Sequence, residues 1–271
     1  LRSIGKYFKM SKATHVSEII LKSTGFEGET AIILGSGLGS FTNILVDKIH
    51  MKYQDLPHYP TSRISGHAGE LVLGNIENKE ILVASGRSHF YEGYSNEKIT
   101  FPIRVFKECG IKNLIITNAA GSLKKSQPPG TIAAIVGHID CSFQKRFEAP
   151  LLNTDPKYHS PRLISLAKFV AKQNKILLNE GNYCWTLGPM YETPQEINYF
   201  KTLNASVVGM STLPEIVQAG LLGLNILTLS IITNFAAGVS EAIPSHEEVL
   251  FNAKNSQKSI VKLLVEIIKK I

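Results

Sequence analysis

Short apolar runs alternate with amphipathic stretches along most of the chain, and this alternation predicts its secondary structure. Several runs hold Ile, Val and Leu at successive positions, a pattern typical of strands that are buried on both faces. We predict strands over residues 30–34, 70–73, 81–84, 113–117, 131–136, 183–187, 206–209 and 225–233. We predict helices over residues 97–108 and 162–173. A third predicted helix opens with Thr193-Pro194-Gln195-Glu196, and the last runs from Ser245-His246-Glu247-Glu248 to the C-terminus. In the last two, a capping hydroxyl is followed three residues later by Glu, which is the pattern of a capping box.

The order of strands and helices predicts an α/β fold in which a central mixed β-sheet is flanked by helices. The chain has no internal repeat, low-complexity tract or long Pro/Gly/Ser linker, so we predict one domain over residues 1–271. Ligands of such sheets bind at the carboxyl ends of the strands. The loops that follow the predicted strands are therefore the candidates for chemistry.

The composition is typical of a soluble globular protein, because 44% of the 271 residues are hydrophobic and 19% are charged. Cys109, Cys141 and Cys184 are odd in number and form no CxxC pair, which argues against a disulfide framework or a zinc knuckle and favours a reducing compartment. No apolar run reaches the length of about 18 residues that a membrane span needs, and residues 1–12 lack the apolar core of a secretory signal. We therefore expect a cytoplasmic protein with no membrane partner. Met10 is a candidate original start, which would make residues 1–9 a non-native or disordered extension.

The formal net charge of +7 raises the question of an acidic partner such as a nucleic acid. The excess of basic over acidic residues lies at the two ends of the chain. The basic residues before residue 11 have no acidic neighbour there, and residues 254–271 hold five lysines against Glu266. Residues 11–253 are balanced in charge, so we predict no nucleic-acid partner.

A glycine-rich stretch, Gly35-Ser36-Gly37-Leu38-Gly39-Ser40, directly follows the first predicted strand. Glycines let backbone N–H groups converge on an anion, and the Ser36 hydroxyl adds a donor. The spacing is GxGxxS, so the stretch lacks the third Gly of the dinucleotide pattern and the Lys of a P-loop. A phosphate-binding loop and a simple tight turn both fit this stretch by itself.

Arg87 and His89 alternate in the loop after the strand predicted at 81–84, so in an extended backbone both side chains point the same way. The fork of Arg donors is suited to phosphate, and a surface Arg–Glu pair beside a core His is the other interpretation. Residues 117–122, Thr-Asn-Ala-Ala-Gly-Ser, form a further predicted loop, where small side chains would let a ligand approach the backbone amides.

Three more predicted strand ends carry polar side chains, in residues 188–193, 208–212 and 232–234. The stretch 209–213 has Leu where the nucleophile elbow of a serine hydrolase needs Gly. The eight His residues form no HExxH sequence and no carboxylate-flanked cluster, so we expect no metal. Together the strand ends predict a site for an anion and a polar ring.

Taken in order, these strand ends resemble the motifs of the trimeric class of purine nucleoside phosphorylases. The matching segments are GSGLGS (35–40), GHAG (66–69), GRSHFYEGY (86–94), FPIRVFKECG (101–110), TNAAGSL (117–123), GPMYET (188–193), VGMSTLPE (208–215), TN (233–234) and SHEEVL (245–250). Each motif is weak on its own. Nine colinear matches from residue 30 to residue 250 identify the chain as a member of this family.

The resemblance implies a single α/β domain, usually assembled as a homotrimer, that uses inorganic phosphate as co-substrate and no metal or organic cofactor. The reaction would be phosphorolysis of a purine nucleoside to the free base and ribose 1-phosphate. The residues that would hold phosphate are Ser36, His67, Arg87, His89, the backbone of Ala119, and Ser211. Those that would hold the ribose are Tyr91, the backbone of Met210, and His246, and those that would hold the base are Tyr191, Glu192 and Asn234. The resemblance assigns catalysis to Asn234, Glu192 and His89.

Two of these residues predict which bases are preferred. An ionised Glu192 only accepts hydrogen bonds, so it fits the N1–H of hypoxanthine or guanine and finds no donor at adenine N1. Asn234 can donate to O6, where adenine carries an amino group. We therefore expect inosine and guanosine to be cleaved in preference to adenosine.

Three segments depart from the family pattern. Residues 137–140, Gly-His-Ile-Asp, lack the acidic residue that usually precedes the His and the Asn that usually follows the Ile. Phe235 stands where the mammalian enzymes have Lys. The segment 142–160 would supply an aromatic side chain to the site of the neighbouring subunit. Its candidates are Phe143, Phe147 and Tyr158.

Three other functions compete with this interpretation. A 5′-methylthioadenosine phosphorylase is related, but it prefers Asp at the position of Asn234 and a small or apolar environment at that of His246. A nicotinamide-dependent oxidoreductase would explain the glycine loop, although not its missing third Gly. A catalytically silent nucleoside-binding protein would not need the complete set of site residues.

Overall fold

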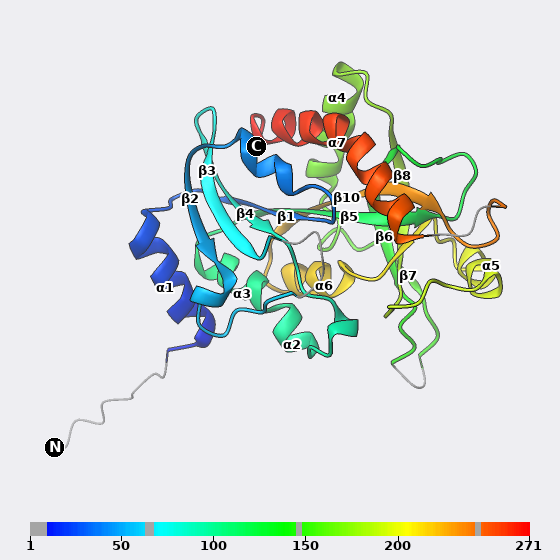
Figure 1. The fold of residues 1–271 in the computed structure, drawn as a ribbon, viewed down its shortest axis with the longest axis horizontal. Helices are drawn as coiled ribbons and strands as arrows, with labels where there is room; N and C mark the ends of the chain where they lie inside the picture. Colours follow the sequence, from blue (N-terminus) through cyan, green and yellow to red (C-terminus); the bar gives the residue numbers. More distant parts are fainter. Residues whose placement is uncertain (1–9, 63–67, 145–147, 242–244) are drawn as a thin grey trace.

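A ten-stranded mixed sheet runs through the molecule, and helices pack on both of its faces (Figure 1). This computed structural model describes residues 10–62, 68–144, 148–241 and 245–271. The strands are β1 (Thr30–Leu34), β2 (Val46–Lys52), β3 (Glu70–Ile76), β4 (Lys79–Ser85), β5 (Asn113–Ser122), β6 (Ile132–Asp140), β7 (Leu152–Asn153), β8 (Leu178–Trp185), β9 (Val207–Gly209) and β10 (Asn225–Phe235). The helices are α1 (Lys12–Thr24), α2 (Asn96–Ile99), α3 (Phe101–Glu108), α4 (Pro161–Gln173), α5 (Pro194–Thr202), α6 (Leu213–Leu221) and α7 (His246–Ile268).

The sheet has two parts that share β5. In one part, β1, β4, β3 and β2 follow β5 in that order as an open sheet. In the other part, β9, β8, β6 and β10 follow β5, and β10 pairs back with β5, so that these five strands close into a ring. β5 runs parallel to β1 and β10 and antiparallel to β9. The predicted single-domain α/β fold with a mixed sheet is confirmed.

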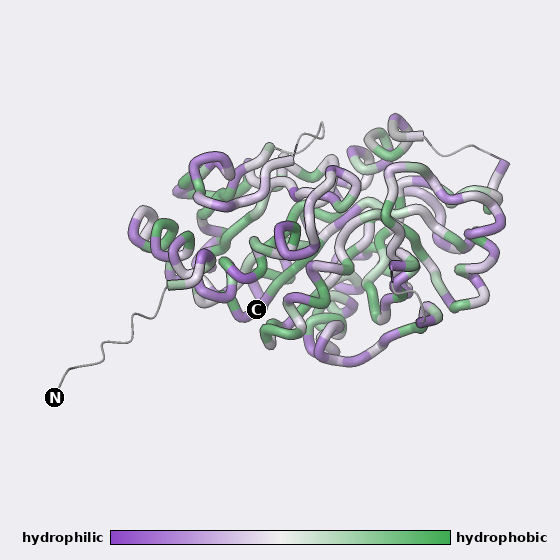
Figure 2. The backbone as a smooth tube through the Cα atoms, turned by 90° about the horizontal axis from the view of Figure 1, so that it is seen from below, coloured by the Kyte–Doolittle hydropathy of each residue, from purple (hydrophilic) through white to green (hydrophobic). Residues whose placement is uncertain are grey.

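Both faces of the central strands are buried, as their continuous apolar runs predict. In β1, Ala31 and Ile33 belong to a core shared with α1, α3 and α6, whereas Ile32 and Leu34 belong to a second core shared with α4 and α7. Figure 1 shows α1, α3 and α6 on one side of the sheet and α4 and α7 on the other. Figure 2 shows most of the hydrophobic stretches inside the molecule and many of the hydrophilic ones at its edges.

All eight predicted strands are present, although several begin or end elsewhere than predicted. The prediction of a loop at residues 117–122 is wrong. These residues are strand, because β10 continues beside them and its Ser230 and Asn234 still align with Asn118 and Gly121 of β5. Residues with small side chains are thus strand here because β10 supplies the backbone hydrogen-bond partners.

The helix predicted over residues 97–108 is in fact two helices. Pro102 has no N–H, and its ring would meet the carbonyl of Lys98 in a continuous helix. The chain therefore ends α2 at Ile99 and begins α3 at Phe101.

The pattern of apolar positions does not predict α1, α6, β2 and β7. β2 is an exposed edge strand without apolar alternation, and β7 has two residues. The predicted capping box of α5 is confirmed, because the Glu196 N–H donates to Thr193 Oγ1 while the Glu196 carboxylate accepts the Thr193 N–H. Within the described residues, no helix is both long and apolar enough to cross a membrane.

Candidate active site

One pocket collects the strand-end residues that the sequence singles out. It encloses about 800 Å³, including its open mouth. Ten of the predicted site residues line it, namely Ser36, Arg87, His89, Tyr91, Ala119, Tyr191, Glu192, Met210, Ser211 and Asn234. They come from segments far apart in the sequence, which the sheet brings together around β5.

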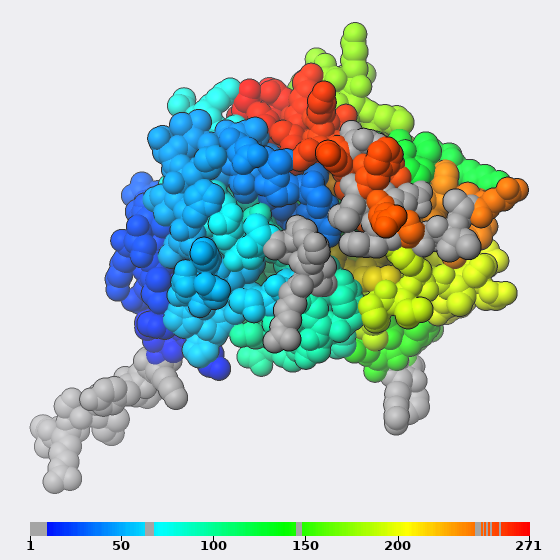
Figure 3. Space-filling model, viewed as in Figure 1, coloured from blue at the N-terminus to red at the C-terminus, as the bar shows by residue number. Residues whose placement is uncertain are grey.

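Two predicted residues are not among these ten. His67 lies outside the described residues. His246 is the first residue of α7, and Val249, one turn later in that helix, lines the pocket. In Figure 3 the orange-red first half of α7 lies on the surface beside segments from the first third and the middle of the chain.

The glycine-rich loop after β1 lies against β5. The Gly35 N–H donates to Thr117 Oγ1 over 2.9 Å, and the same hydroxyl donates to the carbonyl of Ile33 over 3.0 Å. A Cβ on Gly35 would lie 2.8 Å from the Cα of Asn118, so the loop can approach β5 this closely only with glycine. The loop is thereby held where Ser36 lines the pocket.

The middle of β5 offers backbone groups to the pocket. Along one edge of β5, residues 113–116 pair with β1 and residues 121–122 pair with β9. Between them, residues 117–120 have β10 as their only strand partner in the described part of the chain. Ala119, whose backbone the resemblance assigns to phosphate, lies in this interval and lines the pocket. A strand with one open edge, rather than a loop, thus presents this backbone.

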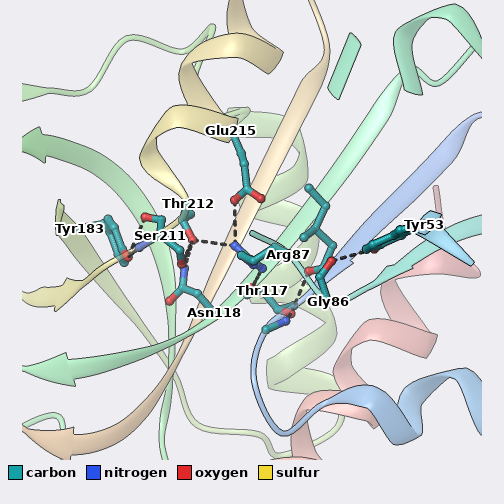
Figure 4. Close-up of polar contacts among 11 residues, drawn as sticks. Tyr53, Gly86, Arg87, Thr117, Asn118, Tyr183, Ser211, Thr212 and Glu215 are labelled. Atoms are coloured by element: carbon teal, nitrogen blue, oxygen red, sulfur yellow. Dashed lines mark hydrogen bonds and ion pairs between the residues drawn. The ribbon is translucent and has the colours of Figure 1, made fainter. Parts of the chain in front are cut away.

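Arg87 is buried in a dense set of polar contacts at the pocket (Figure 4). Its Nη1 donates to Glu215 Oε2 over 2.8 Å and to Thr212 Oγ1 over 3.0 Å, and its Nη2 donates to the carbonyl of Thr117. The side chains of Arg87 and Glu215 are 4% and 5% exposed, so the alternative of a surface Arg–Glu pair is wrong: the pair exists, but it is buried. Burial raises the pKa of the Glu215 carboxyl, and the Arg87 charge opposes this rise.

Ser211 is held by a strained turn. Thr212 has a φ of 78° and a ψ of −47°, and the N–H that follows it donates to the Ser211 carbonyl over 2.9 Å, which makes a γ-turn that is rare for a β-branched residue. The Thr212 hydroxyl contacts Arg87, Asn118 Nδ2 at 3.2 Å and Ser211 Oγ at 3.0 Å. The Tyr183 hydroxyl donates to the Ser211 carbonyl over 3.0 Å. These contacts fix Ser211 beside Arg87.

His89 enters the pocket as a neutral imidazole, because burial and the Arg87 charge lower its pKa to about 3. Glu92 orders this residue: its carboxylate accepts the His89 backbone N–H over 2.7 Å, and its own N–H donates to the His89 side chain. A neutral imidazole that accepts on one ring nitrogen carries its proton on the other, which can donate to an anion. The Tyr91 ring stacks on His89 with the ring centroids 5.0 Å apart.

Glu192 and Asn234 also line the pocket, and each has a hydroxyl partner. Thr186 Oγ1 donates to Glu192 Oε1 over 2.7 Å, and burial raises the pKa of the Glu192 carboxyl. Asn234 Oδ1 accepts from the Thr233 hydroxyl over 3.0 Å, and Asn234 Nδ2 donates to the Phe235 carbonyl over 3.0 Å. Because a carbonyl can only accept, the Phe235 contact determines which end of the amide is nitrogen. One N–H of Asn234 Nδ2 and one lone pair of Asn234 Oδ1 are not used in bonds to described residues, and both can bind a ligand.

The aromatic candidates of the segment 142–160 differ in their surroundings. Tyr158 is buried against His138, with the ring centroids 5.2 Å apart, and belongs to the core. Phe143 is 58% exposed. Phe147 lies outside the described residues.

Several residues that hold the site received no role from the sequence, and Thr186, Thr212 and Glu215 are among them. For Thr212 and Glu215 a signal exists in the sequence, because they have the Thr-x-x-Glu spacing of a capping box shortly after the strand predicted at 206–209. In the structure α6 begins there, but the Thr212 side chain makes no capping bond. For Thr186 the sequence contains no comparable signal.

Metal ligands are not clustered in the described part of the chain, where no three His, Cys, Asp or Glu side chains are placed to hold an ion. Cys109, Cys141 and Cys184 are buried free thiols.

Comparisons with known proteins agree with the geometry of the pocket. Residues 29–269 match the sequence profile of the phosphorylase superfamily. Purine nucleoside phosphorylase 1 of Bacillus subtilis is 38% identical over 249 residues, which cover 88% of this chain and 90% of that protein. The purine nucleoside phosphorylase of Mus musculus is 35% identical over 267 residues, which cover 91% of both chains. A Schistosoma purine nucleoside phosphorylase solved with hypoxanthine is 34% identical and superimposes with a TM-score of 0.86 over 96% of both chains. The chain belongs to the phosphorylase superfamily and, within it, to the purine nucleoside phosphorylases.

Proposed function

We propose that the protein catalyses the reversible phosphorolysis of purine ribo- and deoxyribonucleosides, with a preference for the 6-oxopurine nucleosides inosine and guanosine. The products are the free base and ribose or deoxyribose 1-phosphate, inorganic phosphate is the co-substrate, and no metal or organic cofactor takes part. The observation that carries this proposal is the single pocket in which ten residues from separate strand ends meet. Purine nucleoside phosphorylases of Schistosoma solved with inosine and with guanosine support it.

Phosphate binds where Arg87, the Ser36 and Ser211 hydroxyls, His89 and the open edge of β5 at Ala119 meet. Arg87 supplies the positive charge, and the other groups supply neutral donors. A phosphate dianion held there attacks C1′ of the ribose as the bond from C1′ to the base breaks. It is also the counter-charge for the positive charge that develops on the sugar in the transition state. Tyr91, the Met210 backbone and His246 position the ribose.

The departing purine takes the electron pair of the broken bond and becomes negative. The Asn234 amide, oriented by Thr233 and Phe235, donates to O6 and accepts from N7 as the base gains its proton. An ionised Glu192 accepts the N1–H, and Tyr191 packs on the ring. A 5′-methylthioadenosine phosphorylase is not favoured, because an amide rather than a carboxylate stands at position 234.

Purified protein is expected to release hypoxanthine from inosine only when phosphate is present. The kcat/KM for adenosine should be about 5- to 150-fold lower than that for inosine, since a buried polar group left unpaired costs about 1–3 kcal/mol. Chromatographic assay of the released base, with and without phosphate, measures the phosphate requirement and the two kcat/KM values. A Schistosoma mansoni relative has been solved with adenosine, so the comparison is of rates rather than of binding.

Two results would contradict this proposal. Equal rates for adenosine and inosine would show that the roles given to Glu192 and Asn234 are wrong. Base release without phosphate would indicate a hydrolase.

As the pH is lowered, inosine cleavage is expected to weaken at a higher pH than it would if Glu192 had the pKa of an ordinary carboxyl group. Burial raises the pKa of the Glu192 carboxyl above its usual 4.5, and only the ionised form accepts the N1–H. The value of kcat/KM for inosine should therefore fall as the pH drops through this raised pKa. The profile is measured at a constant concentration of phosphate dianion. Glu108→Gln, which changes an exposed carboxylate at the end of α3, should leave the profile in place. An acidic limb at or below pH 4.5 would refute the assignment.

We also infer a homotrimeric assembly and a cytoplasmic location. The assembly is supported by the family and by Phe143, an exposed aromatic side chain in the segment that the resemblance assigns to the neighbouring site. The location is supported by three free cysteines, which suit a reducing compartment.

A further inference from the structure

Glu215 lies against Arg87 and has no part in the reaction described above. Its Oε2 is 2.8 Å from Arg87 Nη1, and both side chains are closed to solvent. Figure 4 shows Glu215 and Thr212 meeting Nη1, while the Thr117 carbonyl accepts from Nη2. Three of the five N–H groups of the guanidinium donate in these bonds. The other two make no hydrogen bond to a described residue. The carboxylate thus helps to fix the plane of the guanidinium from the side of α6.

The charge of Arg87 is offset before any ligand arrives. Among the described residues that line the pocket, Arg87 is the sole Lys or Arg, and His89 is neutral. Glu215 is in direct contact with the guanidinium, where little water screens the two charges. The pocket therefore has no excess of positive charge when it is empty, although it is proposed to receive a phosphate dianion.

We propose that Glu215 is a positioning residue for phosphate, which fixes Arg87 in the empty enzyme and, by offsetting its charge, limits the affinity for phosphate. This inference rests on the proposed role of Arg87 in binding phosphate. A limited affinity lets phosphate and the sugar phosphate product leave the pocket between turnovers. An amide of the same shape would keep an acceptor for Nη1 and remove the negative charge, so phosphate would bind more tightly.

The test is Glu215→Gln, with the Kd for phosphate measured by calorimetry and the two KM values measured kinetically. We expect the Kd and KM for phosphate to fall about tenfold, because a negative charge close to the dianion is removed in a poorly screened site. The KM for inosine should not change. The melting temperature should be below that of the wild type without phosphate and should rise more than that of the wild type when phosphate is added.

A purely structural role predicts something different. The melting temperature would then drop equally with and without phosphate, and the Kd for phosphate would not change. Glu215→Asp serves as a second variant in case the first does not fold. The aspartate side chain is one methylene shorter, so its negative charge lies further from Arg87. The Kd for phosphate should therefore fall, but by less than in Glu215→Gln. A Kd that is unchanged or higher in the folded variants overturns the proposal.

Ser36→Ala separates this inference from the proposed function. Ser36 lies on the loop after β1 and lines the pocket, so its loss should weaken phosphate binding. If Ser36→Ala leaves the Kd for phosphate unchanged, the proposed phosphate site is wrong. If it weakens phosphate binding while the Glu215 variants fail to strengthen it, only the inference about Glu215 is wrong.

Discussion

Replacing Asn234 with alanine is expected to lower kcat for inosine phosphorolysis about 10²–10³-fold, which is the effect of removing one donor to a developing negative charge. Asn234 is 4% exposed, and its amide is held by the Thr233 hydroxyl and the Phe235 carbonyl. The amide is therefore oriented before the base arrives and costs little reorganisation in the transition state. Steady-state kinetics with inosine at saturating phosphate measures the loss, and the KM for phosphate should not change.

Two further variants make this result specific. Asn198→Ala removes an exposed amide from α5 and should leave kcat unchanged. Thr233→Val removes the hydroxyl that holds Asn234 Oδ1 and should lower kcat less than the loss of the amide itself. If Asn234→Ala kept more than about a tenth of the wild-type kcat, the amide would not be stabilising the leaving base.

Replacing Arg87 with methionine is expected to lower the free energy of unfolding by about 3–5 kcal/mol, because it leaves the buried Glu215 carboxylate without its partner. The loss should be largest at neutral and alkaline pH. Burial raises the pKa of Glu215, so the folded variant takes up a proton as the pH falls, and the penalty then decreases. Urea unfolding at several pH values measures both effects.

The double variant Arg87→Met/Glu215→Met separates stability from function. Replacing both members of a buried ion pair with apolar groups is often close to neutral, so most of the stability should return while phosphate binding stays impaired. Lys168→Met is the matched control. Its pair with Glu180 is about half exposed, and its loss should cost no more than about 1 kcal/mol. A similar small loss in Arg87→Met would show that the buried pair contributes little to stability.

The resemblance predicts the pocket from the sequence, because the residues that line it occur in short segments next to the predicted strands. Ser36, Arg87, Glu192 and Asn234 all stand in such segments, and all four line one pocket. Their roles in binding and catalysis stay predictions, which the variants above test. The order of apolar runs was also enough to predict the strands, because a strand buried on both faces needs apolar side chains at successive positions.

Features that depend on a distant partner were missed or predicted wrongly. Residues 117–122 have small and polar side chains, and only the continuation of β10 beside them makes them strand. The exposed edge strand β2 has no buried face to impose an alternating pattern. In both cases the deciding contact comes from elsewhere in the chain, so local composition could not reveal it.

By itself, the sequence determined the fold class, the strands with buried faces and the kinds of side chain at the candidate site. The tertiary structure alone decided that the charge of Arg87 is offset in the empty pocket. Its partner Glu215 lies 128 residues further along the chain, and the two meet because α6 packs against the same core as β4. Local periodicity carries information about burial, but the balance of charge in a pocket depends on which distant groups the packing brings into contact.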